Sequence, residues 1–282
     1  MVRGESAYFD QILGHLRQSG GFDFNAYKRS SLLRRMMKRM HQVGVTTFEQ
    51  YLDYLQVHQE EFAALFNTIL INVTSFFRDE DVWNYVSSEL LPELISNRTN
   101  AEPLRVWSAG CASGQEAYTA AMMVAEHVGV DDLRDRVEIY ATDVDDEALA
   151  EARQAVYSDR QLEDVPTEFV EKYFEWSANH VTFNRDLRRA VIFGRHDLIQ
   201  DPPISRVDLL LCRNTLMYFN ADAQNRILTR FYFSLNPGGY LMLGRAEMLF
   251  SHSSMFAPVD LKRRIFRTVP TPNQRSSAAS FV

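Results

Sequence analysis

Apolar residues recur at helical spacing through the first third of the chain, which shows no strand signal. This spacing predicts helices over residues 8–16, 27–40, 47–58 and 60–71. Thr47 stands just before the third of these ranges, so its hydroxyl is expected to cap that helix, and Gly44 is expected to end the helix before it. We therefore predict that residues 1–90 form a helical domain.

The pattern changes after Pro92. The polar, turn-rich stretch before Leu104 predicts a linker over residues 91–103. Beyond it, short apolar runs alternate with helical patterns. The runs predict strands over residues 104–109, 137–142, 191–194, 207–212 and 240–244, an edge strand over 264–268, and helices over 116–128, 146–156 and 221–235. Residues 236–239 predict a turn.

Alternation of strand and helix is typical of an α/β fold with a parallel, doubly wound sheet and helices on both faces. The predicted architecture is thus a helical N-terminal domain, a Rossmann-like domain over residues 104–270, and a disordered tail over residues 271–282.

Composition and charge exclude several classes of protein. With 46% apolar and 24% charged residues the chain is an ordinary globular one. It has no apolar run long enough to span a bilayer and no secretory signal at its start. Two cysteines, Cys111 and Cys212, are expected to be buried thiols in a reducing cytoplasm. A net charge of −7 argues against nucleic acid as a partner, and the histidine and cysteine spacing predicts no metal site.

One candidate ligand site is the segment LRVWSAGCASGQEAY, in which a strand runs into Gly110-x-x-x-Gly114 and a helix follows. In a doubly wound sheet this turn faces the ligand crevice, and glycine lets the backbone approach a ligand closely. The spacing is neither GxGxxG nor that of a phosphate-binding loop. Glu116 would repel a pyrophosphate and suit an ammonium group. The alternative is a plain tight turn in which Glu116 complements the helix dipole.

A second candidate is Asp143, at the end of the second strand. A carboxylate there can accept both hydroxyls of a ribose, although it could equally cap the helix that follows. Together with Glu116 it indicates a nucleoside ligand with a positively charged tail and no phosphate. S-adenosylmethionine fits that description, whereas NAD does not.

Four segments carry a more specific resemblance: INVTSFFRD at 71–79, SAGCASGQEAY at 108–118, LLLCRNTLMYF at 209–219 and LNPGGYLMLG at 235–244. In this order and spacing, from Phe22 to Thr268, the chain resembles the CheR family of chemotaxis receptor glutamate methyltransferases. The resemblance implies an S-adenosylmethionine-dependent protein-glutamate O-methyltransferase. We expect it to act in the cytoplasm as a monomer. Its substrates would be chemoreceptor methylation helices, modified to glutamyl methyl esters in sensory adaptation. It also implies a small β-subdomain inserted in the catalytic domain.

The resemblance assigns roles by position. It places Asn72, Thr74, Arg78, Gly110, Arg213 and Asn214 at the cofactor, Glu116 at its amino group, Asp143 at the ribose, Asp197 and Leu198 beside the adenine, and Tyr218 near the methyl-transfer centre. A glutamate carboxylate is already ionised at neutral pH, so catalysis is chiefly positioning and needs no general base. Arg78 is the candidate clamp for that carboxylate. The alternatives are a surface pairing of Arg78 with Asp79 and a core role for Tyr218.

Residues 24–48 contain six Lys or Arg and no acid, and Arg35, Lys38 and Arg39 recur at helical spacing. We hypothesise that this basic face docks the acidic receptor helix; a solvated helix face is the alternative. The stretch at 173–193 contains no glycine, so we predict that the protein does not use the C-terminal pentapeptide tether of some family members.

Three other functions are alternatives. A catalytically weak, cofactor-binding signalling module would share most of these residues. An NAD-dependent oxidoreductase would require the missing GxGxxG loop. A nucleic-acid methyltransferase would need a broader basic surface with aromatic stacking positions.

Overall fold

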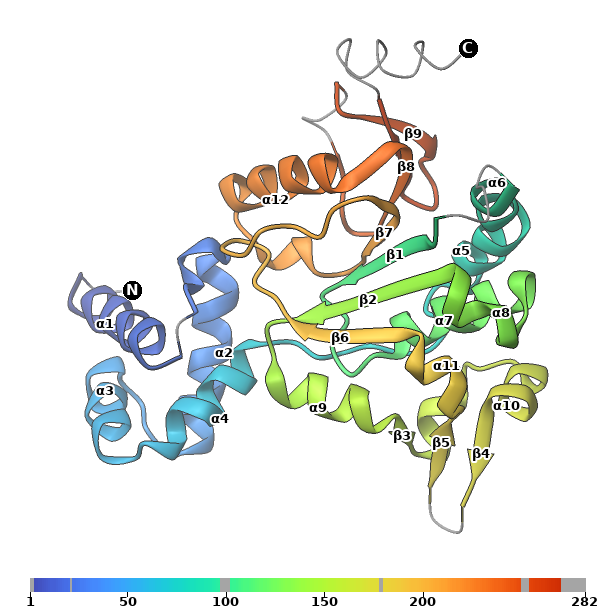
Figure 1. Cartoon of the computed structure of the whole chain (residues 1–282). Helices are drawn as coiled ribbons and strands as arrows, with labels where there is room; N and C mark the ends of the chain where they lie inside the picture. The colour runs from blue at the N-terminus through green and yellow to red at the C-terminus, as the bar shows by residue number, and fades with distance from the viewer. Residues whose placement is uncertain (1–2, 21, 97–101, 178–179, 250–253, 270–282) are drawn as a thin grey trace. The chain divides into compact units, whose positions relative to one another are not determined.

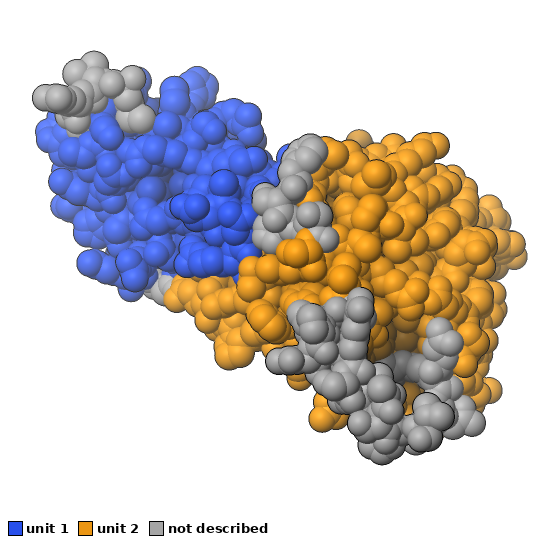
Figure 2. All heavy atoms as spheres, turned by 90° about the horizontal axis from the view of Figure 1, so that it is seen from above, with its two compact units in different colours: residues 1–71, 217–226 blue, residues 72–216, 227–282 orange. Residues whose placement is uncertain are grey.

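The computed structural model describes residues 3–20, 22–96, 102–177, 180–249 and 254–269. The chain forms two compact units (Figure 2). Unit 1 comprises residues 1–71 and 217–226, and unit 2 comprises residues 72–216 and 227–282. The division between Ile71 and Asn72 lies well before residue 90, where the sequence places the end of the helical domain.

Unit 1 is helical, and its four predicted helices are confirmed. Its elements are α1 (Arg3–Gly20), η1 (Phe24–Ala26), α2 (Arg29–Gln42), α3 (Phe48–Val57) and α4 (Glu60–Ile69). The hydroxyl of Thr47 accepts a hydrogen bond from the N–H of Gln50 at 3.2 Å, as expected of a helix cap. Helix α2 ends just before Gly44, whose φ of +76° suits glycine.

Unit 2 begins with a helical segment that the sequence assigns to the N-terminal domain. This segment consists of α5 (Glu80–Tyr85), η2 (Val86–Leu90) and α6 (Leu91–Ser96). Trp83 and Leu91 are buried in the same apolar cluster as Met122 of the catalytic unit. The predicted linker over 91–103 therefore starts as a helix, and residues 97–101 lie outside the described residues. Periodicity identifies these helices, but it does not reveal which core they join.

The main sheet of unit 2 has, among the described residues, seven strands in the order β6-β2-β1-β7-β8-β10-β9 (Figure 1). The strands are β1 (Leu104–Ala109), β2 (Val137–Asp143), β6 (Val191–Arg195), β7 (Val207–Cys212), β8 (Leu235–Leu243), β9 (Phe256–Asp260) and β10 (Ile265–Thr268). The five strands from β6 to β8 are parallel, and β10 runs antiparallel to both its neighbours.

The predicted parallel sheet is therefore mixed at one side, and two details of the prediction were wrong. Strand β10 is interior, and β9 forms the edge instead. Strand β9 escaped prediction because Pro258 interrupts it and Val259 is exposed, so it lacks an alternating pattern. Strand β8 also begins at Leu235 and includes residues predicted as a turn.

Helices cover both faces of this sheet, as predicted (Figure 1). They are α7 (Gln115–Val128), α8 (Val130–Arg136), α9 (Asp146–Gln154) and α12 (Ala221–Ser234). A short helix, η4 (Leu216–Tyr218), lies between β7 and α12 in the chain. Successive residues of β1 face opposite ways. Val106 joins the cluster under α7, and the ring of Trp107 lies 5.5 Å from that of Phe231 on α12.

A small antiparallel sheet, β3-β5-β4, lies in the chain between α9 and β6, where the resemblance implies a β-subdomain. Its strands and neighbouring helices are β3 (Val156–Tyr157), η3 (Asp159–Leu162), α10 (Thr167–Tyr173), β4 (Phe174–Trp176), β5 (Val181–Phe183) and α11 (Arg185–Arg189). Aromatic contacts between Phe183 and Tyr118, and between Phe174 and Phe76, attach it to unit 2.

Candidate functional site

The glycine loop after β1 turns over the end of β2. The N–H groups of Gly110 and Cys111 both donate to the carbonyl of Thr142, at 2.8 and 3.0 Å. Gly110 has φ +82°, and a Cβ there would lie 2.4 Å from the hydroxyl of Thr215. No other residue fits this position without displacing the chain after β7, so the turn that opens the crevice depends on glycine.

Glu116 lies in the first turn of α7, at the carboxyl end of β1. Its Oε1 accepts a hydrogen bond from Ser108 at 2.8 Å, and its Oε2 lies 3.7 Å from Nη1 of Arg213. Burial raises the pKa of Glu116, while Arg213 and Ser108 act in the opposite direction. The carboxylate is therefore buried with only partial compensation of its charge. Such a group is well suited to an ammonium ligand.

Asp143 ends β2 beside this loop. Its two oxygens accept the N–H groups of Ala112, at 2.8 Å, and Asp145, at 3.0 Å. A carboxylate offers about four acceptor positions, so Asp143 can still accept a ligand hydroxyl. Burial raises the pKa of Asp143, and the backbone donors oppose that effect. The alternative role of helix cap is wrong, because Asp145 caps α9 through the N–H groups of Glu147 and Ala148.

The segment Asn72–Asp79, which we call the cap loop, is held to the rest of unit 2 by several hydrogen bonds. The amide of Asn72 donates to Asp145 at 2.6 Å, and the N–H of Phe77 donates to Thr119 at 3.2 Å. Thr74 is half-buried. The guanidinium of Arg78 crosses the loop to the carbonyl of Val73, at 3.1 Å.

Arg213 connects the cap loop to Glu116. Its guanidinium is only 2% exposed and donates to the carbonyl of Arg78, at 2.7 Å, and to the carboxylate of Asp79, at 2.6 Å. Asp79 also pairs with Arg245 at 3.0 Å. The proposed surface pairing of Arg78 with Asp79 is therefore wrong, since the arginines that Asp79 contacts are Arg213 and Arg245. Arg213 therefore contacts both the cap loop and Glu116.

Sequence reasoning missed one buried acid next to this site, Glu247. It accepts hydrogen bonds from the N–H groups of Asn214, at 3.1 Å, and Gly244, at 2.7 Å. The fourth segment of the resemblance ended at Gly244, three positions before this glutamate. No signal for it was available in the sequence alone, because its burial and its two backbone donors are apparent only in the folded chain.

Asp197 and Leu198 are both buried after β6. The carboxylate of Asp197 accepts hydrogen bonds from the N–H groups of Ile199, at 2.7 Å, and Gln200, at 3.3 Å, and from the Gln200 amide, at 2.9 Å. It thus holds its own turn, and its predicted position beside the adenine stays a prediction. Tyr218 belongs to unit 1, where its carbonyl accepts the N–H of Lys28 at 2.8 Å. Its predicted role near methyl transfer likewise stays a prediction.

Cys111 and Cys212 are both buried, as predicted. Burial raises the pKa of each thiol well above its ordinary value, and nearby acids add to that effect. Neither is therefore a thiolate nucleophile at neutral pH.

The basic residues of α2 differ in what they contact. Arg39 makes two hydrogen bonds with Glu61, at 2.7 and 2.6 Å, and Arg35 donates to the carbonyl of Thr68 at 3.0 Å. Lys38 is exposed, as is Arg34 on the same helix. The predicted trio therefore does not form one solvent-exposed face, because two of its three members are engaged inside unit 1.

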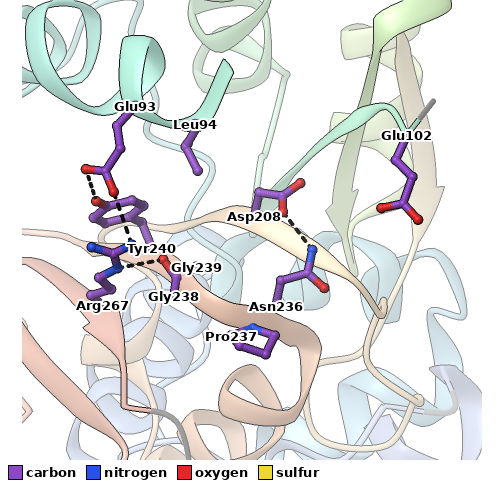
Figure 3. Close-up of a pocket in the computed structure, with 10 residues that line it drawn as sticks. All are labelled: Glu93, Leu94, Glu102, Asp208, Asn236, Pro237, Gly238, Gly239, Tyr240 and Arg267. Atoms are coloured by element: carbon purple, nitrogen blue, oxygen red, sulfur yellow. Dashed lines mark hydrogen bonds and ion pairs between the residues drawn. The ribbon is translucent and has the colours of Figure 1, made fainter. Parts of the chain in front are cut away.

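A cavity of about 300 Å³ lies at the opposite end of the sheet, where β1 and β7 begin (Figure 3). Its carboxylates are already paired. Glu93 contacts Tyr240 and Arg267, at 2.7 and 3.1 Å, and Asp208 accepts from Asn236 at 2.6 Å. The glycine loop, Glu116 and Asp143 all lie at the other ends of the strands, so this cavity is separate from the crevice.

These features fit S-adenosylmethionine. Glu116 offers a partly compensated carboxylate to an amino group, Asp143 offers acceptors to a ribose, and Asn214 contributes a buried Oδ1 that has no hydrogen-bond partner among the described residues. The fold and these residues at the carboxyl ends of the strands define a doubly wound domain that binds a cationic nucleoside cofactor. Residues 72–265 match the SAM-binding domain of CheR methyltransferases, and residues 7–70 match the all-alpha domain of the same methyltransferases. The chain belongs to the CheR methyltransferase family, and S-adenosylmethionine is its cofactor.

Relatives cover most of the chain. It is 32% identical to a chemotaxis protein methyltransferase of Listeria monocytogenes, over 86% of this chain and 89% of that one. It is 30% identical to the chemotaxis protein methyltransferase of Escherichia coli, over 87% and 85%. It is also 35% identical, over 92% of its length, to an uncharacterized 104.1 kDa protein of Rhodobacter capsulatus, of which it spans only 27%. No helix in the described ranges is long and apolar enough to cross a membrane.

Proposed function

We propose that this protein methylates glutamate side-chain carboxylates of chemoreceptors in the cytoplasm, as part of sensory adaptation. The observation that carries the proposal is the cluster at the carboxyl ends of β1, β2 and β7 in unit 2, where burial raises the pKa of both Glu116 and Asp143 and Arg213 links the cap loop to Glu116. The relatives named as chemotaxis protein methyltransferases support the same activity.

When bound, S-adenosylmethionine supplies an electrophilic methyl group on a sulfonium. Glu116 would hold its amino group and Asp143 its ribose. Arg78 would hold the incoming carboxylate by paired N–H donors, because its guanidinium donates one hydrogen bond among the described residues, to the carbonyl of Val73, and most of its donors are left available. The carbonyl of Arg78 accepts a hydrogen bond from Arg213, whose guanidinium also lies 3.7 Å from Glu116. The carboxylate needs no base, so orientation and removal of water are the main tasks of this chain.

The direct test is transfer of a tritiated methyl group to a glutamate-rich receptor fragment, with release of the label as methanol in base. Arg78→Ala should lower kcat/KM by roughly 100-fold. This corresponds to a loss of about 2.7 kcal/mol in transition-state stabilisation, as expected when a charged hydrogen-bonded contact is removed. S-adenosylhomocysteine should still bind within about threefold of wild type. Cofactor binding without any methyl transfer by the unmodified protein would instead support a non-catalytic signalling module.

We further propose that the exposed cations of α2 attract the acidic receptor helix. Arg34 and Lys38 are both exposed on this helix, and Met37 between them has 58% of its surface exposed. Arg29 is exposed as well, but it pairs with Asp10. Reversing both charges, Arg34→Glu with Lys38→Glu, should raise KM for the receptor about tenfold at low salt and reduce its salt dependence. The matched control reverses two exposed charges of unit 2, Arg134 and Lys262. An equal rise in KM in that control would show that the effect depends on net charge and not on the α2 surface, and would contradict this proposal.

A further inference from the structure

Glu247 is a buried carboxylate just after β8 that has no role assigned above. It is 4% exposed. Its Oε2 accepts two backbone N–H groups, from Gly244 at 2.7 Å and from Asn214 at 3.1 Å. These two donors come from chain segments that follow neighbouring parallel strands, β7 and β8. One carboxylate oxygen therefore ties together the two strand ends on that side of the crevice.

The turn that Glu247 holds is an unfavourable one. Asn214 has φ +61°, in the left-handed region, which costs a non-glycine residue about 1 kcal/mol or more. The turn is also crowded, because a Cβ on Gly244 would lie 2.6 Å from the nitrogen of Asn214 and 3.0 Å from its Cγ. A backbone conformation of this kind persists only where surrounding contacts impose it, and the bonds from Glu247 are such contacts.

The side chain that this turn presents has an unused acceptor. Oδ1 of Asn214 is buried and has no hydrogen-bond partner among the described residues. An orphaned buried acceptor destabilises a fold unless a ligand supplies the missing donor. The amino groups of S-adenosylmethionine are donors of that kind, and Asn214 lies among the residues assigned to the cofactor.

We propose that Glu247 is a positioning residue for the cofactor: it fixes the left-handed turn so that the Asn214 amide is held ready for a donor of S-adenosylmethionine. The proposal rests on the assignment of Asn214 to the cofactor site. It is independent of which carboxylate receives the methyl group.

The test is calorimetric titration of the full chain with S-adenosylhomocysteine. Glu247→Ala should weaken binding at least tenfold. Glu247→Gln keeps an oxygen able to accept both N–H groups and should restore affinity to within about fivefold of wild type. The matched control is Asp208→Ala at the other end of β7. Asp208 is 5% exposed and accepts the N–H of Arg105 at 2.9 Å and the Asn236 amide at 2.6 Å (Figure 3).

Asp208→Ala should lower the thermal midpoint while leaving the Kd for S-adenosylhomocysteine within twofold. Unchanged binding by Glu247→Ala would overturn the proposal, and so would an equal loss in Asp208→Ala, since that would reflect general destabilisation. Should Glu247→Ala not fold, Glu247→Asp takes its place. Its shorter side chain cannot reach both donors, so wild-type affinity in that variant would count against the proposal. A chain that binds normally but transfers no methyl group would refute the proposed function and leave this inference intact.

Discussion

Two glutamates, the buried Glu61 of unit 1 and the largely buried Glu116 of unit 2, show how the two regions of this protein differ. Glu61 is 3% exposed and accepts two hydrogen bonds from Arg39 and one from Tyr51, at 2.6 Å. Burial alone would raise its pKa, but Arg39 and Tyr51 outweigh that effect and lower it. Glu116 has one hydrogen bond, from Ser108, and a more distant arginine, and its pKa is raised.

Glu61 therefore stabilises the fold of unit 1, whereas we expect Glu116 to interact with a ligand. In unit 1 the charge is neutralised within the protein, and the three helices α2, α3 and α4 are joined by it. In unit 2 the charge of Glu116 is only partly compensated, so we expect a cationic ligand to supply what the protein does not. Burial of an acid is thus no sign of function by itself; the number and quality of its partners decide.

The largest expected effect is on stability in unit 1. Glu61→Ala leaves the half-buried Arg39 and the hydroxyl of the buried Tyr51 without their partner, so the free energy of unfolding should fall by about 3 kcal/mol. Urea denaturation measures this loss. The neighbouring Glu60, whose side chain is 80% exposed, provides the control, and Glu60→Ala should change stability by less than about 0.5 kcal/mol. The affinity of Glu61→Ala for S-adenosylhomocysteine should be unchanged at temperatures where the variant is folded. A large loss of affinity would show that Glu61 also serves cofactor binding and would contradict the contrast with Glu116.

A second effect falls on binding in unit 2. Glu116→Gln removes the charge offered to the amino group and should weaken S-adenosylhomocysteine binding roughly 30-fold, or about 2 kcal/mol. Stability without ligand should stay the same or rise, because a poorly compensated charge has been removed. Glu126→Gln, at the far end of the same helix, replaces an acid that contacts Lys172 and Tyr173 and should bind within twofold of wild type. Calorimetry of both variants measures this, and equal losses would contradict the assignment of Glu116.

The smallest effect is on the pH dependence of stability without ligand, and the two acids should give opposite signs. The folded pKa of Glu116 is raised above the ordinary 4.5, so its contribution falls as pH rises from that value through the folded pKa. The folded pKa of Glu61 is lowered, so its contribution is present above 4.5 and is lost as pH falls through the folded pKa. Urea unfolding of wild type, Glu116→Gln and Glu61→Ala from about pH 2 to about pH 8 measures both. The advantage of Glu116→Gln over wild type should grow with pH, and a constant difference would be inconsistent with its raised pKa.

The local features of this protein were predictable from its sequence because they depend on neighbours in the chain. Strands β1 and β7 have the predicted bounds, the Thr47 cap forms as expected, and helix α7 follows the glycine loop. The expectation that Glu116 holds an ammonium group rests on charge alone, since an acid in that turn repels phosphate. The four segments of the resemblance identified the family and its cofactor.

Only the tertiary structure decided which residues contact one another across the chain. Helices α5 to α6 join the catalytic core, Arg39 is engaged by Glu61 instead of lying on a docking face, and Asp145 caps α9 in place of Asp143. Arg213 and Glu247 act on residues 135 and 33 positions away. A sequence pattern reports which side chains prefer to be buried or charged. Which distant residue becomes the hydrogen-bond or ion-pair partner of such a side chain depends on how the strands and loops pack together. These long-range pairs are therefore determined by the tertiary structure and not by the local sequence.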